Sequence, residues 1–429
     1  MIIEKLRSFK VIFSNSIFQN ISWLFLDKIL RLGVGLFIGV WVAKYLGPEQ
    51  FGNWNYAIAI LAVLSALSTL GLDQVVIKKL LDFPELEEKL IGNAFFLRFW
   101  GAILASALAI IYSYLFAKND RMLLYIVILT CLNLWFQSFD IIDLKFQSIL
   151  KSKITVIIKN SSFLICSAIK IYLIVTKRHL LFFVFISLLE LILGAIGLVK
   201  QYGFFKVIKW RINFHFAKGL LKDSWPLTLS GIIILLYMRV DQIMIANFLN
   251  NSAVGLYSVS VRFTELWYFI PGIFVGSLFP KLIQIRHDPK YQKLLINLFK
   301  TLFIISFLIS VLISFSAEKL ILYLYGKNFL DAAFALKISI WTGIFVFWGV
   351  GAGNILVIEN LNKHNFYKSI LGLGINIILN FIFIPKMGIN GAAISTLISQ
   401  AFASYLYYLF PKKTRHIFVL QSRSILFFK

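Results

Sequence analysis

Long runs of apolar residues, separated by short polar connections, dominate the chain. A helix needs about 20 mostly apolar residues to cross a bilayer, and about twelve runs reach that length. They lie at about residues 20–46, 55–77, 91–116, 122–147, 154–176, 180–199, 225–249, 253–280, 294–316, 329–358, 366–384 and 389–410. The runs are continuously apolar, whereas the strands of a membrane β-barrel alternate. The pattern therefore predicts an all-α polytopic membrane protein.

The polar connections show a bias that orients the predicted spans. On the side that holds both termini they contain 26 Lys and Arg residues, against 8 on the other side. Cytoplasmic loops of membrane proteins carry an excess of Lys and Arg. We therefore expect both termini to be cytoplasmic.

The composition argues against nucleic-acid binding as the reason for the chain's high positive charge. Of the 429 residues, 59% are hydrophobic and only 14% are charged, and the formal net charge is +24. A nucleic-acid-binding protein can be this basic, but no polar stretch here is long enough to form a soluble binding domain. Most of the positive charge follows from the predicted topology, so no nucleic-acid partner is expected.

The longest basic connection divides the chain into two halves. We expect an N-terminal six-helix bundle over residues 1–200, a cytoplasmic linker over 201–223, and a C-terminal six-helix bundle with a basic tail over 224–429. The halves also resemble each other weakly, because a Leu, a Gly and an aromatic residue recur at an offset of 203 between segments 46–54 and 249–257. This spacing predicts a parallel repeat of two helix bundles.

Several glycines and prolines are expected to form hairpin turns. Pro cannot continue a helix and also restricts the residue before it. Gly47 and Pro48 are thus predicted to end the first span, with Gly52 allowing a tight turn. Pro385 and Gly388 are predicted to do the same between the last two spans.

Three segments carry a resemblance to a known family. They are KYLGPEQFG at 44–52, RVDQIMI at 239–245 continuing to VGLYSV at 254–259, and IPKMGINGAAI at 384–394. Together with the twelve spans, they make the chain similar to the polysaccharide-repeat flippases, the O-antigen and capsule branch of the MATE-like (MOP) exporter superfamily. The resemblance covers essentially the whole chain.

The resemblance implies a function in lipopolysaccharide or capsule assembly. A member with two six-helix bundles would move an undecaprenyl-pyrophosphate-linked oligosaccharide repeat unit across the bacterial inner membrane by alternating access. Its partners would be the lipid-linked oligosaccharide, membrane lipids, H⁺ or Na⁺, and the polysaccharide polymerase and chain-length machinery. The alternatives are a drug/cation antiporter of the same superfamily and, from a different class, a membrane glycan polymerase or ligase.

Basic residues at membrane depth are the candidate substrate ligands. A charge at the centre of a membrane helix costs about 2.5–3.5 kcal/mol on insertion scales, so it must be paired or face water. Arginine suits phosphate because its planar fork donates two parallel hydrogen bonds. The predicted substrate-binding residues are Lys28, Arg31, Arg98, Arg239 and Arg262.

Some of these cations have acidic neighbours on the same helix. Asp27 and Arg31 are four residues apart and could pair, and Arg262 and Glu265 are three apart and could pair. Arg239 and Asp241 are two apart and point away from each other.

Acidic residues at membrane depth are the candidate ion-coupling groups. Asp140 and Asp143 lie on one face of the fourth span, where mutual repulsion would favour binding of a proton or Na⁺. The competing interpretation is an ion pair with Lys145 or with a basic residue of another helix. Asp241 is the second candidate.

The sequence shows no motif for nucleotide hydrolysis or for a metalloprotease. The chain has no phosphate-binding loop of the G-x-x-x-x-G-K-[ST] type and no H-E-x-x-H motif. Its two cysteines, Cys131 and Cys166, both lie in apolar runs, so a disulfide framework is not expected. We expect a transporter, with no enzymatic activity, no cofactor and no metal site of the protein's own.

Overall fold

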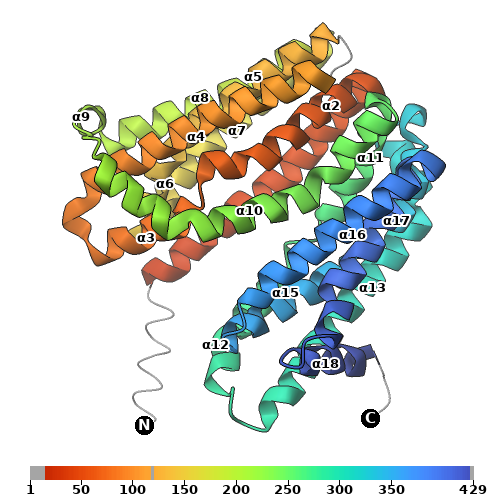
Figure 1. Cartoon of the computed structure of the whole chain (residues 1–429). Coiled ribbons are helices and arrows are strands. Elements are labelled where there is room, and N and C mark those ends of the chain that lie inside the picture. Colours follow the sequence, from red (N-terminus) through yellow and green to blue (C-terminus); the bar gives the residue numbers. More distant parts are fainter. Residues whose placement is uncertain (1–14, 117–119, 426–429) are drawn as a thin grey trace. The chain divides into compact units, whose positions relative to one another are not determined.

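The structure, a computed structural model, describes residues 15–116 and 120–425, and this part of the chain contains helices and no strand (Figure 1). The helices of the first part are α2 (Asn15–Thr69), α3 (Leu72–Asp82), η1 (Pro84–Leu86), α4 (Glu87–Phe116), α5 (Arg121–Gln137), η2 (Ser138–Asp140), α6 (Ile141–Ser148), α7 (Ser152–Val175), α8 (Leu180–Tyr202), α9 (Phe204–Ile208) and α10 (Phe214–Phe248). The helices of the second part are α11 (Asn251–Glu265), α12 (Ile270–Gln284), α13 (Lys290–Leu324), η3 (Lys327–Phe329), α14 (Ala332–Ser339), α15 (Thr342–Ile358), α16 (Lys363–Met387), α17 (Ile389–Ser404), η4 (Leu406–Leu409) and α18 (Arg415–Ile425). The all-helical prediction is confirmed.

The described residues form ten helical stretches that are long and apolar enough to cross a membrane. One of them, Ser22–Asp82, is 61 residues long, which is more than two crossings of about 20 residues each need. It therefore accounts for the first two predicted spans. The last predicted span corresponds to α17, which has 16 residues and is shorter than a full crossing.

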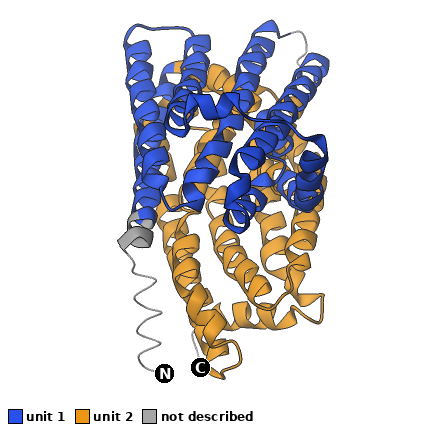
Figure 2. Cartoon of the chain, turned by 90° about the vertical axis from the view of Figure 1, so that its left-hand side faces the viewer, with its two compact units in different colours: residues 1–45, 60–232 blue, residues 46–59, 233–429 orange. Residues whose placement is uncertain are grey.

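The chain folds into two compact units, which Figure 2 shows in different colours. Unit 1 contains Met1–Tyr45 and Ile60–Ile232, and unit 2 contains Leu46–Ala59 and Ile233–Lys429. The boundaries of the units fall inside helices. Helix α2 contributes to both units, and α10 passes from unit 1 to unit 2 after residue 232. The prediction placed residues 214–223 of α10 in the linker, the rest of α10 in the second half, and segment 46–59 wholly in the first half.

Helix α2 is interrupted where the sequence predicts it. Gly47 has φ 73° and ψ 172°, outside the helical region, and Pro48 follows it. A positive φ is readily available only to glycine. The break at Gly47 and Pro48 therefore confirms the predicted end of the first span.

Gly52 has a different function from the predicted one, because it lies inside the helix that follows the break. A Cβ atom on Gly52 would overlap the backbone of Asn251, and a Cβ atom on Gly255 would overlap the carbonyl oxygen of Pro48. The two glycines are the pair that recurs at the offset of 203. Within unit 2 the repeat-related segments thus pack backbone against backbone.

The turn between α16 and α17 is formed by one residue of the predicted pair. Gly388 has φ 59° and caps the end of α16. Pro385 does not end the helix but lies inside it, so that part of the prediction is wrong.

Each unit has its own apolar core. In unit 1 the core joins α3, α4 and α6, and its fully buried members include Leu72, Leu90 and Ile141. In unit 2 it joins α13, α15 and α18 and includes Phe299 and Trp348.

Candidate functional site

Unit 1 contains a cavity of about 270 Å³ lined by charged side chains. Four helical elements contribute them: Asp27 and Arg31 from α2, Asp140 from η2, Lys159 from α7, and Glu190 from α8. The cavity thus combines three carboxylates with two cations. Glu190 was not singled out from the sequence.

Arg31 is held by two carboxylates. Its Nε atom donates to Asp27 Oδ1 at 2.9 Å, and its Nη1 atom donates to Glu190 Oε1 at 3.5 Å. The guanidinium also lies 5.2 Å from the centre of the Phe163 ring. The predicted pairing of Asp27 with Arg31 is therefore present. Lys28 is exposed and is not among the residues that line this cavity.

The two predicted coupling carboxylates of unit 1 share one partner. Lys159 Nζ lies 2.8 Å from Asp140 Oδ1 and 2.8 Å from Asp143 Oδ2. Lys145, the same-helix alternative, instead pairs with Glu87. Asp140 and Asp143 are thus brought together as predicted, with their charges opposed by a lysine of another helix.

Arg98 is buried in unit 1, with 4% of its side chain exposed, and forms an ion pair with Asp73. It does not line the cavity of Asp27 and Arg31, although the charge of Asp140 acts on it. Arg98 therefore has a carboxylate partner.

In unit 2, Arg239 pairs with Glu265 through a fork-to-fork contact. The two parallel hydrogen bonds, from Nη1 to Oε1 and from Nη2 to Oε2, are each 3.1 Å long. The sequence suggested that Glu265 could pair with Arg262, three residues away. The structure gives the carboxylate to the arginine 26 residues away instead.

Arg262 forms no ion pair within the described residues and lies against an aromatic ring. Its guanidinium carbon lies 5.5 Å from the centre of the Phe51 ring. Its Nη1 atom and the Tyr325 hydroxyl are both buried, and although the two side chains interact, neither atom makes a hydrogen bond of good geometry within the described residues. A buried donor without a partner costs about 1–3 kcal/mol, more when it is charged, so the site favours an added acceptor.

Asp241 is a buried carboxylate of unit 2, with 4% exposure, and neutral groups bind it. Asn380 Nδ2 donates to Oδ1 at 2.7 Å, while the hydroxyls of Tyr257 and Thr396 donate to Oδ2 at 2.8 Å and 2.5 Å. Asn376 accepts a hydrogen bond from Asn380 at 3.0 Å and extends the network. Arg239 and Asp241 are indeed separate, as the spacing predicts.

The network around Asp241 contains oxygen atoms that could hold a hard cation. Asn380 Oδ1 is buried and has no hydrogen-bond partner among the described residues. Carboxylate, amide and hydroxyl oxygens are the ligands of such cations. A group of three or more His, Cys, Asp or Glu side chains that could hold a metal ion is absent from the described residues.

The neutral members of this network were not predicted from the sequence. Asn376 and Asn380 are four residues apart in an apolar run, so they share a helix face. Two amides on one face of a membrane span were the available signal, since polar groups there need partners.

Comparisons with known proteins agree with this architecture. A capsular polysaccharide biosynthesis protein, CapF of Staphylococcus aureus, is 22% identical over 407 residues, which cover 92% of this chain and 99% of CapF. The inward closed structure of the lipid II flippase MurJ matches with a TM-score of 0.69 at 19% identity, covering 95% of this chain and 91% of MurJ. An inward-facing multidrug resistance MATE transporter of the MOP superfamily matches with a TM-score of 0.65 at 13% identity, covering 94% of this chain and 99% of the transporter.

The family model for polysaccharide biosynthesis proteins matches residues 41–334, more than half of the chain. This segment includes the break at Gly47, the repeat-related glycines and most of the membrane-depth charges described above. The chain is a multi-pass membrane protein that belongs to the polysaccharide biosynthesis protein family.

Proposed function

We propose that the protein flips an undecaprenyl-pyrophosphate-linked oligosaccharide repeat unit across the bacterial inner membrane by alternating access. The family membership and the fold shared with a lipid II flippase support a lipid-linked cargo. The excess of basic residues on one predicted side supports cytoplasmic termini. A polysaccharide polymerase and chain-length machinery remain predicted partners.

Arg262 is the observation that carries this proposal. Arg31, Arg98 and Arg239 each have a carboxylate partner, so much of their charge is already used. Arg262 has no ion pair within the described chain and has an unpartnered Nη1 atom. A pyrophosphate would supply the missing acceptors, because guanidinium and phosphate form charge-assisted hydrogen bonds. We propose Arg262 as the principal phosphate ligand, and phosphate binding by the exposed Lys28 of unit 1 stays a separate prediction.

Ion coupling is proposed at Asp241. Its carboxylate is buried among neutral donors, so a proton or Na⁺ would neutralise it, with Asn380 Oδ1 as a further ligand. The same role for Asp140 and Asp143 remains a prediction. There, the Lys159 ammonium already occupies the position of a bound cation.

The cavity of unit 1 does not favour the alternative of a drug antiporter. The acid-lined cavity of unit 1 has a volume of about 270 Å³, and pockets for drug-sized molecules have about 300–1,000 Å³. Its carboxylates also pair with Arg31 and Lys159, so they are less available to a cationic drug.

The proposed function is tested in proteoliposomes that contain a fluorescent undecaprenyl-pyrophosphate-linked oligosaccharide. Loss of a charged hydrogen bond of about 1.5–3 kcal/mol in Arg262→Ala corresponds to a fall in translocation of about 10- to 100-fold. Arg121→Ala, at the exposed start of α5, is the matched control. Unchanged translocation in Arg262→Ala would remove the phosphate-binding assignment, and a wild-type protein without translocation would refute the function.

A further inference from the structure

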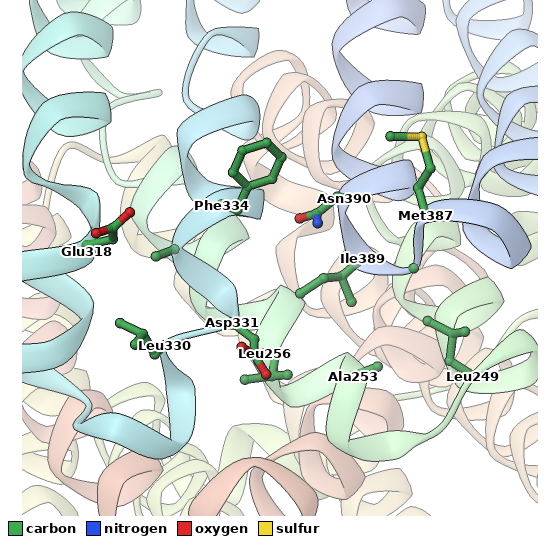
Figure 3. A pocket seen from close by; sticks show the side chains of 12 residues that line it. Leu249, Ala253, Leu256, Glu318, Leu330, Asp331, Phe334, Met387, Ile389 and Asn390 are labelled. Carbon is green, nitrogen blue, oxygen red and sulfur yellow. The ribbon is translucent and has the colours of Figure 1, made fainter.

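Unit 2 contains a second cavity, of about 560 Å³, at the end where three of its connections meet (Figure 3). Its walls come from the α10–α11 connection, from the end of α13 with the following η3–α14 segment, and from the α16–α17 turn. All three connections lie on the non-cytoplasmic side of the predicted topology. No residue of this cavity belongs to the Asp241 network or to the Arg262 surroundings.

The lining combines polar oxygens with exposed apolar side chains. Asp331, at the start of α14, is exposed and takes part in no ion pair within the described residues, whereas Glu318 pairs with Lys337. Asn390 Oδ1 is buried and lacks a hydrogen-bond partner in the described part of the chain. Phe334, with 56% exposure, supplies an aromatic surface.

Figure 3 shows how these groups are distributed around the cavity. Phe334 and Asn390 come from different helices, α14 and α17, and lie on one side of the view, while Asp331 lies below them. An aromatic surface, a carboxylate and an amide therefore surround one space. Its volume lies within the range of about 300–1,000 Å³ that small-molecule sites occupy.

This combination selects a class of ligand. A sugar ring presents C–H groups that pack on an apolar or aromatic surface, and hydroxyl groups that donate to carboxylate and amide oxygens. The one unpaired charge among the described lining residues is negative, so it opposes phosphates and acidic sugars and attracts an amine. The apolar surface, with Phe334 at 56% exposure, distinguishes the cavity from a simple acidic cluster.

We propose that this cavity is a glycan-binding subsite on the exit side, which takes a neutral or amino-bearing sugar of the cargo and disfavours acidic sugars. The proposal rests on the proposed function, because that function supplies both the cargo and the orientation of unit 2. The subsite would hold the glycan after the headgroup reaches the outer face. Its residues are different from Arg262, the proposed phosphate ligand.

The test is saturation-transfer NMR on the full chain in lipid nanodiscs with three disaccharide probes. The probes are neutral N,N′-diacetylchitobiose, its de-N-acetylated cationic form, and anionic digalacturonic acid. The expected order of affinity is cationic, then neutral, then anionic. Phe334→Ala should weaken the first two by about tenfold, as expected for loss of an aromatic contact. Asp331→Asn should lower the ratio of the affinities for the cationic and the neutral probe by about fivefold. This change corresponds to the upper range of energies of an exposed ion pair.

Matched controls come from the same unit. Tyr323→Ala removes an aromatic side chain that is 84% exposed near the same end of α13 but does not line the cavity. Glu49→Gln removes an exposed carboxylate outside it. Neither should change binding of any probe.

Failure of this inference can be distinguished from failure of the proposed function. Equal affinity for all three probes, no binding, or equal losses in the control variants would overturn the subsite, even if wild-type translocation proceeds. Selective binding that depends on Asp331 and Phe334 would support the subsite. If the protein then fails to translocate the lipid-linked probe, the flippase assignment is lost and a glycan-binding site remains.

Discussion

Apart from the exposed Lys28, the membrane-depth charges of unit 1 described above are all in ion pairs, whereas unit 2 combines one such pair, Arg239 with Glu265, with two charges that have no ionic partner in the described residues. In unit 1, Lys159 contacts both Asp140 and Asp143, and Arg31 contacts both Asp27 and Glu190. In unit 2, neutral groups bind the buried Asp241, and Arg262 lies beside an aromatic ring with no ion pair in the described part of the chain. In unit 1 the opposite charges form ion pairs with each other. In unit 2, Asp241 and Arg262 form no ion pair within the described residues.

This difference separates structural charges from charges that can act on a ligand. Breaking a buried ion pair leaves an uncompensated charge, so such pairs resist exchange of partners. A buried carboxylate or guanidinium without a counter-ion gains more from binding a mobile one. The comparison therefore supports helix attachment by the pairs of unit 1, and it is the basis of our proposals that Asp241 couples an ion and Arg262 binds phosphate.

The largest expected effect is on the stability of unit 1. Lys159→Ala leaves Asp140 and Asp143 without their shared cation, and the expected loss is about 3 kcal/mol, the lower end for a broken buried pair because both acids retain some water contact. Thermal unfolding in detergent measures it. Adding Asp140→Asn and Asp143→Asn to Lys159→Ala should restore most of the loss. If Lys159→Ala unfolds like the wild type, the pair is not structural.

The second effect concerns ion dependence. Asp241→Asn keeps the shape of the side chain but removes the charge that a proton or Na⁺ would neutralise. Translocation should no longer respond to an imposed H⁺ or Na⁺ gradient, and stability should fall by about 1–3 kcal/mol through weakened hydrogen bonds. Gradient-driven uptake assays decide this. A variant that keeps its gradient response would place coupling elsewhere, with Asp140 and Asp143 as the next residues to change.

The smallest expected effect is at Arg262. Because no carboxylate of the described residues pairs with Arg262 and lysine keeps the positive charge, Arg262→Lys breaks no ion pair and should change the stability by less than about 1 kcal/mol. Translocation should fall only several-fold, since lysine keeps the charge but loses the bidentate fork. The same change at Arg239, which would disrupt the fork-to-fork contact with Glu265, is the control and should cost more stability. Equal stability losses at the two arginines would contradict the comparison.

The sequence predicted the spans and their breaks because these depend on local properties. Run length determines whether a helix can cross a bilayer, and the pair Gly47 and Pro48 interrupts α2 through its own backbone restrictions. The two repeat-related glycines were also visible as an offset of 203, although their role in close packing was not.

The partners of the charges could not be predicted in the same way. Glu265 had a candidate partner three residues away and another 26 residues away, and the choice depends on how α10 and α11 are rotated against each other. Asp241 similarly draws Asn380 from a helix 139 residues further along the chain. Such pairings follow from tertiary packing, which sequence spacing does not contain.

The contact between Gly52 and Gly255 has a consequence for how the protein is made. Segment 46–59 belongs to unit 2 but leaves the ribosome 203 residues before the glycine against which it packs. At about 5–20 residues per second, the interval is roughly 10–40 s. During that time the segment lacks its native neighbours. A bulkier residue at either glycine would therefore disturb the packing only late in synthesis, when both segments are present. An isolated C-terminal half would lack segment 46–59, the part of unit 2 that is translated first.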